Sequence, residues 1–218
     1  MNPIRVVIAD DQPLILSSLQ LVLETDPGIS VVGTARTGAQ AIGMVHELAP
    51  EVVLMDIQMP EMDGIAATAH LVRDTSAKII VLTTFNRDDY LFDALDAGAS
   101  GFLLKNTEPE NLIQAVHQVA AGHGLLSPEV TLKLIRRRTP HPASAEDAEA
   151  QVLLHKLTER ELQVLTALAG GKNNQEIAEQ LGLSEATVKT HLSNLLAKTN
   201  LRDRVQAALF AHRVGLIQ

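Results

Sequence analysis

The chain has 218 residues, of which 46% are hydrophobic and 20% charged, and this composition is typical of one or two globular domains rather than a disordered chain. The absence of cysteine excludes disulfide frameworks, Cys-ligated zinc, iron–sulfur clusters and thiol catalysis. Aliphatic runs are far shorter than the ~20 residues that span a bilayer, and Arg5 and Asp10 interrupt the N-terminal segment, so we expect a soluble cytoplasmic protein with no membrane partner.

The formal net charge of -8 is unevenly distributed along the chain. Residues 1–130 carry 17 Asp and Glu against 6 Lys and Arg, whereas residues 131–156 and 157–218 have net charges of +2 and +1. An acidic surface repels nucleic acid, so any such contact is expected in the C-terminal part. The asymmetry predicts two modules with different partners.

Short β-rich runs alternate with longer amphipathic segments over the first 125 residues. The runs predict strands at Ile4–Ala9, Ile29–Ala35, Val52–Met55, Lys78–Leu82 and Gly101–Leu104. Apolar residues recur at spacings of three and four in the segments between them. They predict helices at Leu14–Glu24, Ala39–Glu47, Ile65–Arg73, Asp89–Ala97 and Glu110–Ala121. Alternating strands and helices favour an α/β fold, a doubly wound five-stranded parallel sheet covered by helices on both faces.

The pattern changes after Gly124. A short helix is predicted over Pro128–Arg138, and residues 139–156, with two prolines among small polar residues, are predicted to be an unpacked tether. From residue 157 the periodicity is helical, with Gly or Asn in the breaks. The four predicted helices are Glu159–Ala169, Asn174–Leu181, Glu185–Thr199 and Arg204–Val214. We therefore expect an α/β domain over 1–124, a linker with a short helix over 125–156, and a small all-α domain over 157–218.

Polar side chains follow the carboxyl ends of four predicted strands. They are Asp10 and Asp11 after the first strand, Asp56 after the third, Thr83 after the fourth and Lys105 after the fifth. In a doubly wound sheet these positions converge on one crevice. Three carboxylates there favour a shared cation, and all-oxygen ligation favours Mg²⁺. Singly, each residue is explained by a helix cap, a solvated charge or strand propensity; together they predict a phosphoryl site, since a carboxylate can accept that group.

Four segments of this part resemble a two-component receiver domain. They are Val7–Asp11, Leu54–Gly64, Val81–Thr83 and Gly101–Lys105. The resemblance covers residues 3–123 and implies a flavodoxin-like fold. It also implies that Asp56 accepts phosphate from a sensor histidine kinase.

The same resemblance implies roles for the residues around the acceptor. The implied Mg²⁺ ligands are Asp10, Asp11, Asp56 and the backbone carbonyl of Gln58. Thr83 and Lys105 would bind the new phosphoryl oxygens. Phe102 stands where the family has its switch aromatic, without the hydroxyl often found there, so a switch in this chain would rest on packing.

The second and third helices of the C-terminal part are joined by a three-residue turn. In it Gly182 can adopt the left-handed conformation, and Ser184 can cap the helix that follows. That helix has an apolar face expected to pack inward, formed by Val188, Leu192, Leu195 and Thr199. The opposite face is small and polar with flanking lysines. Such a face fits the DNA major groove, although an amphipathic helix that merely faces solvent is the simpler alternative.

The segments Leu157–Leu165, Asn174–Ala178 and Leu183–His191 are similar to the LuxR-type helix-turn-helix. The resemblance implies that Glu185–Thr199 is the recognition helix. The implied base or groove contacts are Lys189, Thr190 and Ser193, and the implied phosphate contacts are Thr187, Asn194 and Lys198. It also implies a dimer helix at 204–214, with Val205, Ala208 and Leu209 on one stripe. A domain of net charge +1 would bind DNA weakly alone, so two copies on paired half-sites are expected.

Through these two resemblances the chain is identified as a member of the NarL/FixJ class of response regulators. Such a protein is a transcription factor rather than an enzyme: a histidine kinase phosphorylates it, and it then forms a homodimer on double-stranded promoter DNA. Two alternatives stay open. A haloacid-dehalogenase-type Mg²⁺-dependent phosphohydrolase would need a second Asp two residues after an Asp at the end of the first strand, a spacing that Asp10-Asp11-Gln12 lacks. A regulator independent of phosphorylation would not need the complete acidic set.

Overall fold

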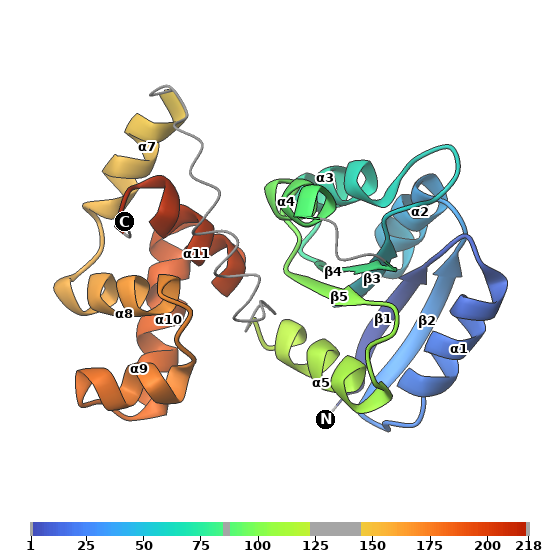
Figure 1. Ribbon diagram of the computed structural model, residues 1–218, viewed down its shortest axis with the longest axis horizontal. Helices are drawn as coiled ribbons and strands as arrows, with labels where there is room; N and C mark the ends of the chain where they lie inside the picture. The colour runs from blue at the N-terminus through green and yellow to red at the C-terminus, as the bar shows by residue number, and fades with distance from the viewer. Residues whose placement is uncertain (1, 85–87, 123–144, 217–218) are drawn as a thin grey trace. The chain divides into compact units, whose positions relative to one another are not determined.

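The computed structural model describes residues 2–84, 88–122 and 145–216, and the chain divides into two compact units, residues 1–125 and 126–218 (Figure 1). The helix expected over 128–138 and the start of the tether lie outside the described residues. Within the described residues, no helix is long and apolar enough to cross a membrane.

The described part of the N-terminal unit contains a parallel sheet whose strands follow the order β2-β1-β3-β4-β5. The strands are β1 (Ile4–Ala9), β2 (Ile29–Ala35), β3 (Val52–Asp56), β4 (Lys78–Thr83) and β5 (Gly101–Leu104). Strand order reverses beside β1, so the carboxyl ends of β1 and β3 border the crevice at which such sheets bind ligands. The expected α/β fold is confirmed, and β3 and β4 each run one residue further than predicted, to include Asp56 and Thr83.

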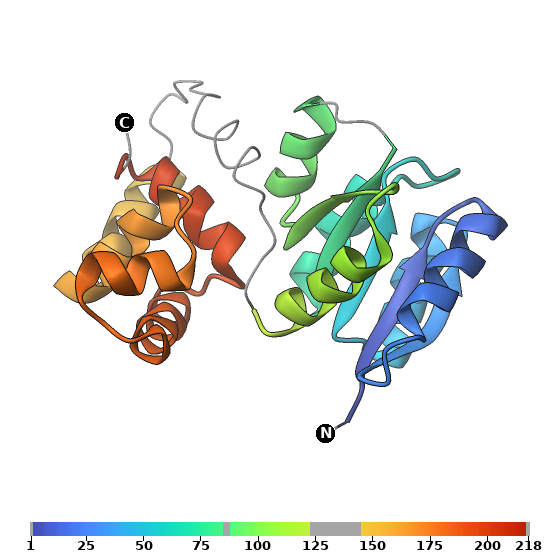
Figure 2. The ribbon, with the colours of Figure 1, turned by 60° about the horizontal axis from the view of Figure 1, so that its bottom comes forward.

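Helices cover both faces of this sheet (Figures 1 and 2). Their bounds are α1 (Pro13–Leu23), α2 (Gly38–Leu48), α3 (Gly64–Asp74), α4 (Asp88–Asp96) and α5 (Pro109–Ala120). Side chains of α1 and α5 pack with Val6 and Ile8 on one face, while those of α2, α3 and α4 pack with Val7 and Ala9 on the other. Because strand residues point alternately to opposite faces, the near-continuous apolar runs of the strands fill two cores.

The described part of the C-terminal unit, residues 145–216, is built from helices joined by turns. Its helices are α7 (Ala145–Leu154), α8 (Glu159–Ala169), α9 (Asn174–Leu181), α10 (Glu185–Thr199) and α11 (Arg204–Arg213). Thr158 and Asn173 begin α8 and α9 with reciprocal capping boxes, and Ser184 caps α10 by accepting from the Thr187 N–H at 3.1 Å. Gly182 ends α9 at φ 66°, a left-handed conformation that glycine adopts without strain. These caps produce the expected helix-turn-helix.

Helix α7 corrects the prediction of an unpacked tether over 139–156. Its composition of Ala and Glu favours a helix, and Ala150, Leu153 and Leu154 are spaced to form one apolar stripe. These three side chains pack against the core of the C-terminal unit. The side chain of Gln151 also donates to the Val214 carbonyl at 3.3 Å. The C-terminal unit therefore extends further towards the N-terminus than residue 157.

Replacing Ala150 by Glu is expected to lower the free energy of unfolding of the C-terminal unit by about 1–2 kcal/mol, because α7 would detach rather than bury the charge. Native-state hydrogen exchange of amides in α8 and α10 would measure the change. Val152→Glu, on a side chain of the same helix that is 60% exposed, should change that free energy by no more than ~0.5 kcal/mol. Equal effects of the two substitutions would show that the face of α7 bearing Ala150 does not stabilise the unit.

Candidate functional site

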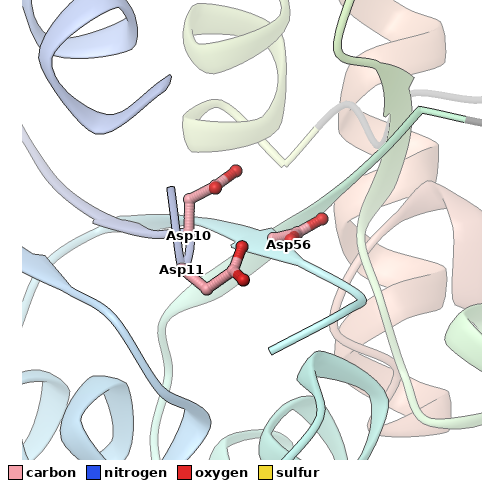
Figure 3. Close-up of side chains that lie close together, drawn as sticks. All are labelled: Asp10, Asp11 and Asp56. Atoms are coloured by element: carbon pink, nitrogen blue, oxygen red, sulfur yellow. The ribbon is translucent and has the colours of Figure 1, made fainter. Parts of the chain in front are cut away.

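Three carboxylates meet where β1 and β3 end. Asp10 follows β1 and is fully buried, Asp11 is half-buried, and Asp56 is the last residue of β3 and is buried. One carboxylate oxygen from each lies within 4.8 Å of the others, and Figure 3 shows the three side chains grouped at the strand ends. The sheet therefore brings together residues that are 46 positions apart in sequence, as the strand-end pattern predicts.

Lys105 binds two of these carboxylates. Its ammonium nitrogen Nζ lies 2.5 Å from Oδ2 of Asp10 and 3.0 Å from Oδ1 of Asp56, and its side chain is only 7% exposed. The backbone N–H of Lys105 donates to the Thr83 carbonyl at 2.8 Å, so the end of β4 fixes where the lysine leaves β5. The other oxygen of Asp10, Oδ1, accepts from the Gln12 N–H at 3.0 Å.

The charges of the cluster perturb one another. Burial raises the pKa of Asp56, the hydrogen bond and charge of Lys105 partly oppose that effect, and neighbouring Asp10 adds to the increase. Burial alone would lower the pKa of Lys105, but its bonds to Asp10 and Asp56 outweigh burial and raise it. One ammonium cannot neutralise three carboxylates. The donor set therefore fits a divalent cation with oxygen ligands, such as Mg²⁺.

The remaining residues predicted for this site lie around the cluster. Thr83 is buried at the end of β4, and Phe102 on β5 is half-buried against the core that includes α4. Gln58 is exposed two residues beyond Asp56, and its side-chain amide Nε2 lies 3.5 Å from the Tyr90 hydroxyl. The structure thus brings Lys105 into direct contact with Asp10 and Asp56, places Asp11 beside those two carboxylates, and joins the Thr83 carbonyl to the backbone N–H of Lys105.

Gly64 supports the site, although no role for it follows from the sequence alone. Its N–H donates to the Ile57 carbonyl at 2.9 Å, and a Cβ placed on it would lie 1.8 Å from the backbone oxygen of Asp56. Asp63 caps α3 by accepting from the Ala66 N–H at 2.7 Å. The first residue of α3 therefore touches the backbone of β3 at Asp56, which is possible only without a side chain.

The C-terminal unit exposes a polar face on α10. The inward face is confirmed, because Val188, Leu192, Leu195 and Thr199 are all buried. Of the residues predicted to contact DNA, Lys189, Thr190, Ser193, Asn194 and Lys198 are exposed, and Thr187 is half-buried. The Thr187 and Ser184 hydroxyls share a hydrogen bond of 2.8 Å, and Thr190 donates to the Ala186 carbonyl at 3.0 Å. Two of the hydroxyls are thus already bonded within the unit.

Three residues of this unit, Lys198, Val205 and Ala208, have surroundings that the sequence does not reveal. Lys198, at the end of α10, forms an ion pair of 2.7 Å with Glu161 on α8. Val205 on α11 is fully buried, and Ala208 packs against the core. The stripe expected to face a second copy is therefore partly an internal surface, because the apolar periodicity of α11 fits the core of its own unit.

Comparisons with known proteins match both units. The family model of the response regulator receiver domain matches residues 6–117, and that of the luxR family of bacterial regulatory proteins matches residues 155–211. The transcriptional regulatory protein LiaR of Bacillus subtilis is 39% identical over 215 residues, covering 98% of this chain and 99% of LiaR. The response regulator VraR of Staphylococcus aureus is 38% identical over 216 residues and 99% of both chains.

Solved structures agree with these matches. The response regulator ChrA of a heme-sensing two-component system is 33% identical over the full length of both chains, with a TM-score of 0.54. The RcsB response regulator of Salmonella typhimurium is 27% identical over 92% of this chain and 94% of that one, with a TM-score of 0.57. Both matches extend over the two units.

Proposed function

The chain belongs to the transcriptional response regulators that join a receiver domain to a LuxR-type DNA-binding domain, and we propose that phosphorylation of Asp56 controls its binding to DNA. A sensor histidine kinase would supply the phosphoryl group, and promoter DNA would be the second partner. Phosphorylation would also bring two copies together on paired half-sites, because a DNA-binding unit of such low positive charge binds weakly alone.

The observation that supports Asp56 as acceptor is its contact with Lys105 at 3.0 Å inside a buried acidic cluster. In the transfer, a carboxylate oxygen of Asp56 forms a bond to phosphorus while the bond from phosphorus to the histidine nitrogen breaks. Lys105 and the Thr83 hydroxyl then bind the phosphoryl oxygens. A phosphoryl oxygen thereby replaces the Asp56 carboxylate oxygen as the second partner of Lys105, beside Asp10. Phosphorylation would also change how the Phe102 side chain packs against the core that includes α4.

Asp10, Asp11, Asp56 and the Gln58 carbonyl are the residues that would hold Mg²⁺. When bound there, the ion neutralises negative charge that develops on the phosphoryl group. The protein itself contributes by holding these ligands in place. Burial of Asp10 and its bond to the Gln12 N–H hold that carboxylate at the edge of the sheet.

On the DNA side, the proposed contacts are the outward residues of α10. Lys189, Thr190 and Ser193 would reach base edges or the groove, and Thr187 and Asn194 would contact phosphates. Two of these hydroxyls would have to exchange an internal hydrogen bond for one to DNA. The resemblance also implies a phosphate contact for Lys198, at the end of the same helix, but the Lys198 ammonium forms an ion pair with Glu161 at 2.7 Å.

Chelating Mg²⁺ is expected to slow phosphorylation by at least about tenfold, because uncompensated carboxylates then face the incoming phosphoryl group. Intact mass spectrometry would measure the rate at which the phosphoryl adduct forms on the full chain, incubated with a small acyl phosphate with or without excess chelator. A single phosphoryl adduct that forms at equal rates in both samples would contradict the assigned metal site. Sustained hydrolysis of small phosphate esters would favour the phosphohydrolase instead.

A further inference from the structure

The Glu161 carboxylate joins two helices through one oxygen. Glu161 is the third residue of α8, and its Oε2 accepts from the Thr158 N–H at 2.8 Å, which completes the capping box at the start of that helix. The same oxygen accepts from Nζ of Lys198, near the end of α10, at 2.7 Å. One atom thus links the start of α8 to the last turn of the recognition helix.

The burial of Glu161 favours keeping the ion pair between Glu161 and Lys198 intact. The Glu161 side chain is 4% exposed, whereas that of Lys198 is 39% exposed. Burial alone would raise the pKa of Glu161, but the bonds to Lys198 and to the capping residue Thr158 outweigh burial and lower it. The carboxylate is therefore charged, and a lysine that swung away to a phosphate would leave that buried charge without its cation.

We propose that Lys198 is a positioning residue, held by Glu161 to set the orientation of α10 on α8, and does not neutralise a DNA phosphate. This inference revises the role expected from the sequence, and it rests on the proposed use of α10 to read DNA. The apolar face of α10 already fixes the helix against the core. The ion pair adds a polar contact at the C-terminal end, which limits rocking of the helix about that core.

The chain offers a matched control in α9, which begins with a second capping box. There Oε2 of Glu176 accepts from the Asn173 N–H at 2.7 Å. Glu176 is exposed, and the nearby Lys172 bonds to Gln180. Glu176→Gln therefore removes the carboxylate of a capping box that is not bonded to Lys198; besides the cap, it removes only the charge interaction of that carboxylate with Arg204 at the start of α11 among those that the structure describes.

The experiment compares four variants of the full chain: Glu161→Gln, Lys198→Met, the double variant and Glu176→Gln. The probes are a duplex selected from a random pool by the wild-type chain and an unrelated duplex of equal length. Affinity for each is measured over a range of salt concentrations, at a temperature where circular dichroism shows every variant folded. The wild-type chain and all variants are first phosphorylated with Mg²⁺ and a small acyl phosphate, and a phosphorylated wild-type chain that selects no duplex would refute the proposed DNA binding itself.

Under the proposal, Glu161→Gln and Lys198→Met each weaken binding to the selected duplex by about tenfold, a typical size for coupling between contacting residues. The double variant is no weaker than either single variant. In both single variants, the affinity for the unrelated duplex and the dependence of binding on salt stay as in the wild-type chain. The Glu176→Gln variant binds the selected duplex with wild-type affinity. A general loss of stability would not produce this combination.

A phosphate contact at Lys198 gives the opposite pattern. Lys198→Met would then lower the salt slope by about one and weaken binding to both duplexes. Glu161→Gln would tighten binding, because it frees the lysine and removes a negative charge. Either that pattern, or unchanged affinity for the selected duplex in both single variants, would overturn the proposal.

Discussion

Asp56→Asn is expected to abolish the phosphoryl adduct, with a loss of at least about 100-fold in the rate of phosphorylation, because an amide oxygen is a far weaker nucleophile than a carboxylate. The fold should tolerate the change. Asn has nearly the same shape, and it removes one charge from a cluster whose burial raises the pKa of Asp56. Lys105 keeps its ion pair with Asp10 at 2.5 Å. Intact mass after treatment with Mg²⁺ and a small acyl phosphate measures the loss.

Asp63→Asn is the matched control on the loop that follows. Asp63 caps α3 from an exposed position, and Asn caps a helix about as well as Asp. This variant should therefore accept phosphate at the wild-type rate. An adduct that persists in Asp56→Asn, mapped by peptide mass to Asp10 or Asp11, would show that the acceptor has been assigned to the wrong carboxylate.

Gly64→Ala should have a large effect on stability, although the residue has no reactive group. The new Cβ would lie 1.8 Å from the Asp56 backbone oxygen and 2.8 Å from its carbonyl carbon. Backbone cannot move aside as a flexible side chain can, so α3 or the end of β3 must shift. We expect a loss of about 3 kcal/mol in the free energy of unfolding of the N-terminal unit. Calorimetry of the full chain measures the loss, and phosphorylation should slow with it.

Gly43→Ala provides the control with the opposite sign. Gly43 lies inside α2, is exposed, and has open space where a Cβ would be. Alanine there should stabilise the unit by ~0.5–1 kcal/mol, since glycine is a poor helix residue. If both glycine substitutions were neutral or stabilising, the close approach of α3 to the end of β3 would be refuted.

Most of the N-terminal fold follows from sequence patterns. Each strand is a short apolar run between amphipathic segments, and the rule that parallel strands end at one edge brings Asp10, Asp56 and Lys105 together before any coordinates are known. The role of Gly64 is hidden from the sequence. It depends on how closely the start of α3 approaches the end of β3, a tertiary distance that no local pattern encodes.

The C-terminal unit shows where sequence patterns mislead. Helix α7 looks like a linker because its residues are small and polar, and its apolar stripe has only three members. The pairing of Glu161 with Lys198, separated by 37 positions, depends on how α8 and α10 cross. The periodicity of α11 correctly predicts a helix, but it cannot distinguish a stripe that faces a second copy from one that faces the core, as buried Val205 demonstrates.

Binding of the full chain to its selected duplex, with and without phosphorylation, tests the central claim most directly. The wild-type chain and Asp56→Asn are each treated with Mg²⁺ and a small acyl phosphate, and intact mass verifies the adduct before binding is measured. We predict that the phosphorylated wild-type chain binds at least about tenfold more tightly than the untreated chain, within the usual range of coupling between sites, and that treatment leaves Asp56→Asn unchanged. Equal affinity of the phosphorylated and untreated wild-type chains would contradict control by phosphorylation and identify a regulator that binds DNA independently of it.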